Sequence, residues 1–298
     1  MFETLFEFLK AKDVKYDTNV RVADISPVGI GGPCHAVVWP RDIETLVCVV
    51  EFLENNQKEY KIVGRMTNLL VGDLGYDGVI IRTDALRGFR IDRNRVYVEC
   101  GATMPYIARR VAELGLSGLE ELSGIPGSIG GMIICNAGAY GRDTSDVLKS
   151  VTLLDRRSGE VKTVDAGEIS FSYRHSSLSS GACVVIAATV ELSFDDSEHI
   201  RRTMTEFSNA RRDSQPYGMR SLGSTFKRPI FGYASRMIDE CGLKGYRIGG
   251  AEISDKHAGF IVNRGDATAD DFLRLMALAR ERVYERFGVV LEPEIEIL

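Results

Sequence analysis

Hydrophobic residues recur at helical spacing in several parts of the chain. Between residues 42 and 53 they form one stripe, and Asp42 precedes this stripe as a capping residue. The longest stripe covers 268–287, where Thr268 is placed to cap a helix and Gly288 to end it. Further helices are predicted for the amphipathic N-terminal stretch 1–17 and for 103–114, 197–212 and 233–240.

Short runs of apolar residues of the kind found in β-strands lie between these helices. They predict strands at 36–39, 60–63, 79–82, 96–100, 148–155, 160–164 and 183–193, and a final strand within 289–298. The order of the elements indicates an α+β protein with a small N-terminal module, a strand-rich middle and a third module from about residue 200.

Composition and charge narrow the function classes. The 298 residues are 44% hydrophobic and 27% charged with a net charge of −5, and Lys and Arg do not cluster, so nucleic acid is not an expected partner. No apolar run approaches the roughly 20 residues that span a bilayer, and the N-terminal stretch does not resemble a signal peptide. The six cysteines and four histidines are scattered, which predicts reduced cysteines, a cytoplasmic location and no metal site.

The segment Ser123–Gly141, SGIPGSIGGMIICNAGAYG, contains six glycines in nineteen residues. Glycine loses more backbone entropy on folding than other residues, so this density indicates a backbone that needs positive φ or lies close to a ligand. Main-chain N–H groups in such a segment favour an anion, and a phosphate-bearing ligand is the expected partner. The apolar residues within the segment argue against a solvent-exposed loop.

A second candidate phosphate loop, GRMTNLLVG at 64–72, follows the strand predicted at 60–63, although a plain turn accounts for its pattern equally well.

The chain lacks GxGxxG at a strand–helix turn, GxxxxGK[ST] and GxSxG. A Rossmann domain, a P-loop and an α/β-hydrolase elbow are therefore disfavoured.

Three groups of polar residues are candidates for chemistry. Ser224, in GSTFKRP, is either a helix or turn cap or a proton donor near cations. Arg174, in SYRHSS, is either a surface ion-pair partner or a group that stabilises negative charge. Glu292, Glu294 and Glu296 alternate along the final strand and would share one face, which is typical of a solvated edge. His257 is expected to make structural hydrogen bonds.

Taken together, the motifs resemble the UDP-N-acetylenolpyruvoylglucosamine reductase family almost end to end. The ordered set is GIGGP (29–33), TNLLV (67–71), SGIPGSIGG (123–131), NAGAYG (136–141), YRHS (173–176), GSTFKRP (223–229), GLKGYRIGGAEISDKHAGFIVN (242–263) and LEPEIEI (291–297). The compact third module is similar to that of the family's shorter subgroup.

This resemblance implies a two-subdomain FAD-binding fold of the vanillyl-alcohol-oxidase (PCMH) type, followed by a C-terminal α+β substrate domain. The expected domains are 1–82 and 83–196 for FAD and 197–298 for substrate, with the last strand returning to the active site. In the family, NADPH reduces FAD, and the enolpyruvyl group of a UDP-sugar then takes the hydride during peptidoglycan precursor synthesis. A monomer or weak oligomer is expected, with no metal and no nucleic acid or membrane partner.

The resemblance also assigns site residues. It implies that Ser224 donates the proton, that Arg174 stabilises the enol-type intermediate and that Glu294, the one of the three glutamates picked by the register, polarises it. The implied cofactor-binding residues are Gly64, Arg65, Met66, Thr67, Asn68, Leu69, Ser123, Gly124, Ile125, Pro126, Gly127, Ser128, Gly130, Gly131 and Ala139. The implied substrate-binding residues are Tyr173, Lys227, Arg228 and Lys256.

The chain departs from the family pattern in a few places. Met66 stands where a glycine is usual, which predicts a reshaped loop or weaker flavin binding because Met adopts positive φ only at a cost. Arg220 and Leu222 stand where proline and a smaller residue are commoner, and Ser235–Arg236 replace glycine–lysine. The rival hypotheses are a flavin oxidase of the same fold and a non-catalytic protein that binds flavin or a nucleotide sugar.

Overall fold

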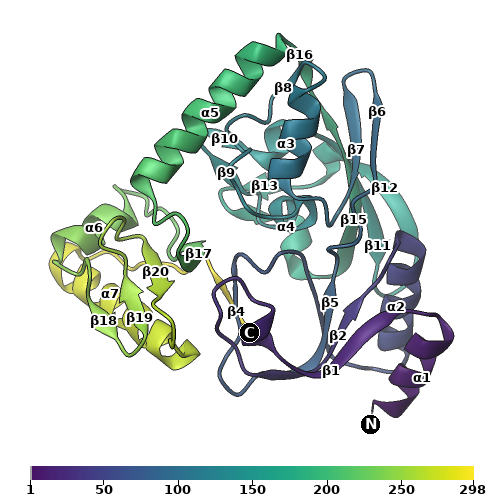
Figure 1. The fold of residues 1–298 in the computed structure, drawn as a ribbon, viewed down its shortest axis with the longest axis horizontal. Helices are drawn as coiled ribbons and strands as arrows, with labels where there is room; N and C mark the ends of the chain where they lie inside the picture. The colour runs from purple at the N-terminus through teal and green to yellow at the C-terminus, as the bar shows by residue number, and fades with distance from the viewer. Residues whose placement is uncertain (1) are drawn as a thin grey trace. The chain divides into compact units, whose positions relative to one another are not determined.

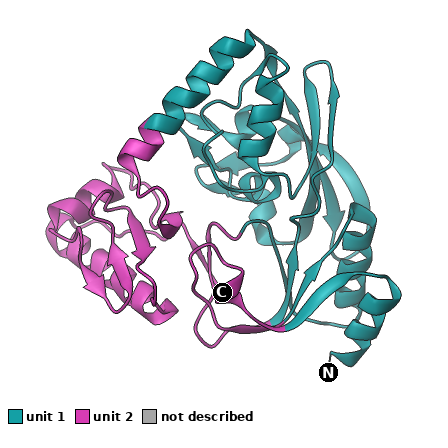
Figure 2. Cartoon of the chain, viewed as in Figure 1, with its two compact units in different colours: residues 1–18, 36–65, 78–209 teal, residues 19–35, 66–77, 210–298 magenta. Residues whose placement is uncertain are grey.

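The structure is a computed structural model that describes residues 2–298. The chain divides into two compact units: unit 1 consists of residues 1–18, 36–65 and 78–209, and unit 2 of residues 19–35, 66–77 and 210–298 (Figure 2). Unit 2 is thus assembled from three separate stretches of sequence. The three-domain division at residues 82 and 196 stays a prediction.

Unit 1 contains two sheets (Figure 1). The first is a four-stranded sheet, most of which belongs to unit 1. Its strands lie in the order β1 (Lys15–Arg21), β2 (Pro33–Trp39), β5 (Tyr76–Arg82), β3 (Tyr60–Val63). Strands β3 and β5 run parallel. The second is an antiparallel sheet in the order β12 (Val161–Asp165), β11 (Leu148–Asp155), β15 (Cys183–Glu191), β7 (Arg95–Glu99), β6 (Phe89–Asp92). Two-stranded pairings join β8 (Leu116–Ser117) to β16 (Ser193–Phe194), β9 (Gly138–Ala139) to β10 (Arg142–Asp143), and β13 (Phe171–Ser172) to β14 (His175–Ser176).

The helices of unit 1 supply the apolar stripes that pack on these sheets. They are α1 (Glu3–Ala11), α2 (Ile43–Asn55), α3 (Met104–Ala112), α4 (Ile129–Ile134) and most of α5 (Ser197–Ser214). In α2 the predicted cap is confirmed, because Asp42 Oδ1 accepts a hydrogen bond from Thr45 N–H at 2.7 Å. Residues of both sheets, of α1 and of α2 to α4 form one continuous core. The long helix α5 is mostly exposed, with Ile200 as its buried residue.

Unit 2 is built around an antiparallel sheet in the order β17 (Arg220–Ser224), β20 (Phe260–Asn263), β19 (Ala251–Ile253), β18 (Arg247–Ile248). Helices α6 (Ala234–Glu240) and α7 (Ala269–Phe287) contribute to its core, together with Val28, Ile30 and Leu70 from the two shorter stretches. Both predicted ends of α7 are confirmed: Thr268 Oγ1 accepts from Asp271 N–H, and Gly288 has φ 67°.

The final strand predicted over 289–298 is only partly formed. Its regular part, β21 (Glu296–Ile297), pairs in parallel with β4 (Leu69–Leu70). The tail is extended but changes its hydrogen-bonding partner at Glu294, first pairing with residues 225–227 and then with residues 68–70. Pro293 stands at this change and lacks an N–H group, which limits a continuous ladder.

Among the described residues 2–298, the helices are too short or too polar to cross a bilayer.

Candidate active site

The two glycine-rich segments meet in unit 1 at Gly64 and Ser128. Gly64 follows β3, and a Cβ added there would lie 2.0 Å from the Ser128 Oγ, so only glycine fits. Ser128, which is buried, precedes α4. The structure thereby brings residues of both predicted phosphate loops into direct contact.

The glycine-rich segment keeps main-chain donors available. Within residues 2–298, no hydrogen bond is formed by the N–H groups of Gly124 and Gly127, whereas those of Ile129 and Gly130 donate to the carbonyls of Ala102 and Cys100. Backbone N–H groups next to a helix start suit a diphosphate. The sequence did not predict α4, because a run of Ile, Gly and Met carries no clear helical signal.

The predicted cofactor-binding residues of the first loop fall in both units. Gly64 and Arg65 belong to unit 1, whereas Met66, Thr67, Asn68 and Leu69 belong to unit 2. Met66 is buried and has φ 56°, so it occupies the left-handed region that glycine favours. The Asn68 Nδ2 donates to the carbonyl of Glu294 at 3.0 Å, and this contact was not predicted because 226 residues separate the two.

Arg174 lies in unit 1 with its guanidinium oriented by the segment after α4. Its Nη2 donates to the Gly138 carbonyl at 2.6 Å and its Nη1 to Asp143 Oδ1 at 3.2 Å. The guanidinium also lies 4.9 Å from the centre of the Tyr173 ring. Arg174 has φ 54°, a strained conformation for a non-glycine residue that is often found at functional sites. Ala139 follows Gly138 in β9.

Ser224 and Glu294 are brought together within unit 2. Ser224 is the last residue of β17, after a register shift at which Gly223 has φ 79°. The next residue, Thr225, accepts at its carbonyl a hydrogen bond of 2.9 Å from Glu294 N–H. Ser224 is therefore a strand residue rather than a turn cap, and it lies next in sequence to the partner of Glu294.

The three glutamates of the tail do not share one exposed face. Glu292 and Glu296 are exposed and Glu294 is half-buried. Glu292 Oε2 lies 3.6 Å from Lys227 Nζ. Partial burial distinguishes Glu294 from the other two, and the expectation of a uniform solvated edge is wrong because the tail changes partner at this residue.

The remaining predicted substrate residues of unit 2 are held by local contacts. The Arg228 guanidinium lies 4.2 Å from the Tyr233 ring centre, and Lys256 Nζ donates to the Arg212 carbonyl at 2.5 Å. Burial lowers the pKa of His257, whose Nδ1 accepts from Gly259 N–H. This hydrogen bond matches the structural role expected for His257.

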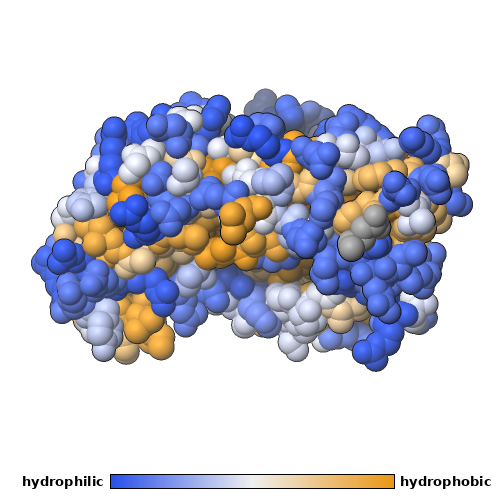
Figure 3. Space-filling model, turned by 90° about the horizontal axis from the view of Figure 1, so that it is seen from below, coloured by the Kyte–Doolittle hydropathy of each residue, from blue (hydrophilic) through white to orange (hydrophobic). Residues whose placement is uncertain are grey.

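Hydrophobic side chains also reach the surface, where they gather among hydrophilic ones (Figure 3). In unit 2, Ile230 and Phe231 are 93% and 79% exposed and follow Lys227–Arg228 closely in sequence.

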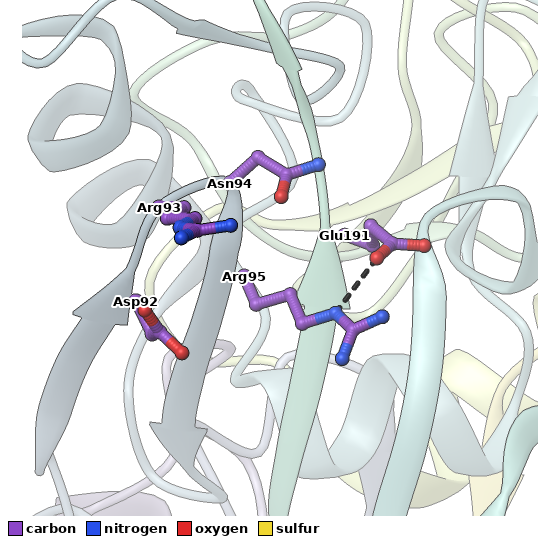
Figure 4. A pocket seen from close by; sticks show the side chains of 5 residues that line it. All are labelled: Asp92, Arg93, Asn94, Arg95 and Glu191. Atoms are coloured by element: carbon purple, nitrogen blue, oxygen red, sulfur yellow. Dashed lines mark hydrogen bonds and ion pairs between the residues drawn. The ribbon is translucent and has the colours of Figure 1, made fainter.

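An open hollow of about 380 Å³ lies at the turn between β6 and β7 (Figure 4). It is lined by Asp92, Arg93, Asn94, Arg95 and Glu191, and Arg95 Nε pairs with Glu191 at 2.7 Å. None of the predicted site residues lines it, and its polar, exposed lining shows no catalytic arrangement.

Comparison with known proteins bears on both parts of the chain. Residues 33–165 match the FAD binding domain, and residues 215–298 match the C-terminal domain of UDP-N-acetylenolpyruvoylglucosamine reductase. The UDP-N-acetylenolpyruvoylglucosamine reductase of Caldicellulosiruptor bescii is 41% identical over 293 residues, which are 98% of this chain and 93% of that protein.

Solved structures are similar as well. The crystal structure of UDP-N-acetylenolpyruvylglucosamine reductase from Thermus caldophilus has a TM-score of 0.80 and 34% identity, and the match covers 95% of this chain and 98% of that one. A variant of berberine bridge enzyme, 15% identical, matches 65% of this chain and 44% of its own with a TM-score of 0.50, a likeness of fold alone. The predicted α+β, PCMH-type FAD-binding fold with an added C-terminal domain is confirmed.

Proposed function

Because this chain belongs to the UDP-N-acetylenolpyruvoylglucosamine reductase family, we propose that Arg174, Ser224 and Glu294 are the catalytic residues of its reaction. The reaction is the NADPH-dependent reduction of UDP-N-acetylglucosamine enolpyruvate to UDP-N-acetylmuramate, in peptidoglycan precursor synthesis. When bound, FAD supplies the hydride chemistry between NADPH and the enolpyruvyl group.

The glycine-rich segments are suited to hold the cofactor's diphosphate. The contact of Gly64 with Ser128 places backbone from two loops together, and the N–H groups of Gly124 and Gly127 are available to an anion. We assign the remaining predicted cofactor residues to cofactor binding as well. Because main-chain N–H groups would bind the diphosphate, its binding needs no charged side chain in the segment Ser123–Gly131.

The catalytic roles follow from the chemistry of addition to an enolpyruvyl group. Hydride arrival at the β-carbon builds negative charge on the α-carbon and carboxylate, which the Arg174 guanidinium stabilises. The Ser224 Oγ donates its proton to the α-carbon, and the Glu294 carboxyl group polarises the intermediate by hydrogen bonding. The observation that best supports the pairing of Ser224 with Glu294 is the 2.9 Å hydrogen bond from Glu294 N–H to the carbonyl of Thr225, the residue next to Ser224.

Cationic side chains are suited to bind the diphosphate of the substrate, and an aromatic ring is suited to pack against its sugar. Lys227, Arg228, Lys256 and Tyr173 supply these groups in our assignment. The ion pair between Lys227 and Glu292 is weak because both side chains are accessible to water. In our assignment Lys227 leaves this pair and binds the substrate. We also expect a monomer or weak oligomer in the cytoplasm, where the nucleotide substrate and NADPH are available.

Replacing Ser224 separates the two halves of the reaction. We expect Ser224→Ala to be reduced by NADPH at the normal rate, because proton donation is not needed in that half. Reoxidation by the enolpyruvyl UDP-sugar should slow by about 10²–10⁴-fold, the usual contribution of a positioned general acid. Anaerobic stopped-flow absorbance of the flavin measures both rates.

The matched control is Ser214→Ala, which changes an exposed serine at the end of α5 and should keep both rates. Normal reoxidation in Ser224→Ala would remove Ser224 from the mechanism. A flavin that reoxidises rapidly with oxygen and ignores the enolpyruvyl sugar in the unaltered protein would contradict the assigned reaction.

A further inference from the structure

Asn68 holds the C-terminal tail on both sides of Ile295. Its side-chain Nδ2 donates to the carbonyl of Glu294 at 3.0 Å, and its own carbonyl accepts from Glu296 N–H at 2.9 Å. The parallel pairing of β4 with β21 begins at the next residue, Leu69, opposite Glu296. The Asn68 amide is thus the first link between this loop and the tail.

Glu294 has both of its main-chain polar groups bonded by different segments of unit 2. Its N–H donates to the Thr225 carbonyl, and its carbonyl accepts from the Asn68 amide. Two bonds from opposite sides fix the φ and ψ of a residue far more narrowly than one, and they fix the direction in which its side chain leaves the backbone. Ser224 precedes Thr225 directly, so the same bonds set the placement of Glu294 relative to Ser224.

We propose that Asn68 is a positioning residue for Glu294, which its side-chain amide holds in register with the strand of Ser224. The inference rests on the proposed catalytic role of Glu294. It gives the side chain of Asn68 a role other than cofactor binding, because that side chain already donates to the Glu294 carbonyl. The main-chain N–H of Asn68, which donates to no other described residue, is the group left for a cofactor phosphate.

The test uses Asn68→Asp, which keeps the shape of the side chain and replaces the donor with an oxygen. We expect reoxidation of the NADPH-reduced flavin by the enolpyruvyl UDP-sugar to slow by about tenfold, the effect of losing one partly buried hydrogen bond. Asn68→Ala, which adds no charge beside the cofactor phosphate, should slow reoxidation to a similar extent. In Asn68→Ala, reduction by NADPH and the FAD dissociation constant, measured by flavin fluorescence, should stay within about twofold.

A double-mutant cycle shows whether Asn68 acts through Glu294. Adding Asn68→Asp to Glu294→Gln should slow reoxidation little beyond Glu294→Gln alone, because a positioning residue loses its effect when the group it places is gone. If the two substitutions slowed reoxidation independently, so that their fold-changes multiplied in the double variant, the proposal would be wrong.

Asp73→Asn is the control within the same stretch. Asp73 accepts from Ala269 N–H and Asp270 N–H at 2.8 and 2.9 Å and so ties this stretch to the start of α7 without touching Glu294. It should lower the thermal midpoint and leave the reoxidation rate unchanged, which separates tethering from positioning.

Two further results overturn the inference in distinguishable ways. Weak FAD binding with normal reoxidation in Asn68→Ala would make the side chain a cofactor ligand and remove its positioning role alone. Normal reoxidation in Glu294→Gln would remove the catalytic role of Glu294 and, with it, the positioning role of Asn68.

Discussion

Backbone strain at single residues accompanies the candidate site. Met66, Asn136, Tyr140 and Arg174 all have positive φ without being glycine, with values from 43° to 56°. Such conformations cost on the order of 1–3 kcal/mol each and persist where surrounding contacts hold them. Met66 has φ 56°, in the left-handed region that glycine adopts most easily, and burial of its side chain offsets part of the cost.

Substituting Met66 separates strain from burial. Met66→Gly and Met66→Ala both lose the buried side chain, but only glycine relieves the left-handed backbone. We therefore expect Met66→Gly to be about 1 kcal/mol more stable than Met66→Ala, the reverse of the usual order. Urea unfolding of the two variants measures this difference. An alanine variant at least as stable as the glycine variant would contradict a left-handed residue 66.

At the scale of elements, the sequence predicts what local signals determine. Helices α2 and α7 were predicted together with their capping residues. The hydrophobic stripe and the residues that begin or end each helix all lie within one short segment of sequence. A final strand that contains β21 was predicted, but strand β4 and its pairing with β21 were not, because the two strands are more than 220 residues apart in the sequence. For the same reason the sequence pointed to Glu294 only through the family resemblance and gave no indication that Asn68 holds it.

The hairpin of β18 and β19 carries a buried carboxylate. Glu252 is 1% exposed, and it pairs across the strands with Arg247 and with Arg264. Hydrogen bonding to Arg264 lowers the pKa of the Glu252 carboxyl group below its ordinary value, so the ionised form stabilises the fold.

The pH dependence of stability tests this pair. A carboxyl group with a lowered pKa contributes stability above its unfolded-state pKa and loses that contribution as pH falls through the folded-state pKa. We expect Glu252→Gln to cost about 2 kcal/mol at pH 7 and progressively less below about pH 4.5. Urea unfolding at pH 7 and below about pH 4.5 measures this loss of stability. An equal loss under both conditions would show that the charge of Glu252 does not stabilise the fold.

At the scale of the whole molecule, unit 2 is discontinuous, and its core depends on that. Val28, Ile30 and Leu70 come from the two short stretches and pack with residues of α6, α7 and the sheet. The family match to residues 215–298 therefore covers only part of the unit that the chain folds into.

A fragment of residues 215–298 should not fold cooperatively. Removal of the three aliphatic side chains takes away about 2 kcal/mol each, about 6 kcal/mol in all, which is comparable to the stability of a small domain. We expect poor amide dispersion in its NMR spectrum and no sigmoidal thermal transition by circular dichroism. A cooperative transition like that of the intact chain would show that the short stretches are dispensable.

The partner change at Glu294 also has a kinetic meaning. Contacts such as Asn68–Glu294 and Val28–Asn263 close loops of 226 and 235 residues, whereas the strands β11, β12 and β15 pair over short distances along the chain. Long loops lose more entropy when they close, so local pairings form first. Refolding should accordingly regain most of its secondary structure before Glu294 is in place, and enzymatic activity should return later than the circular dichroism signal.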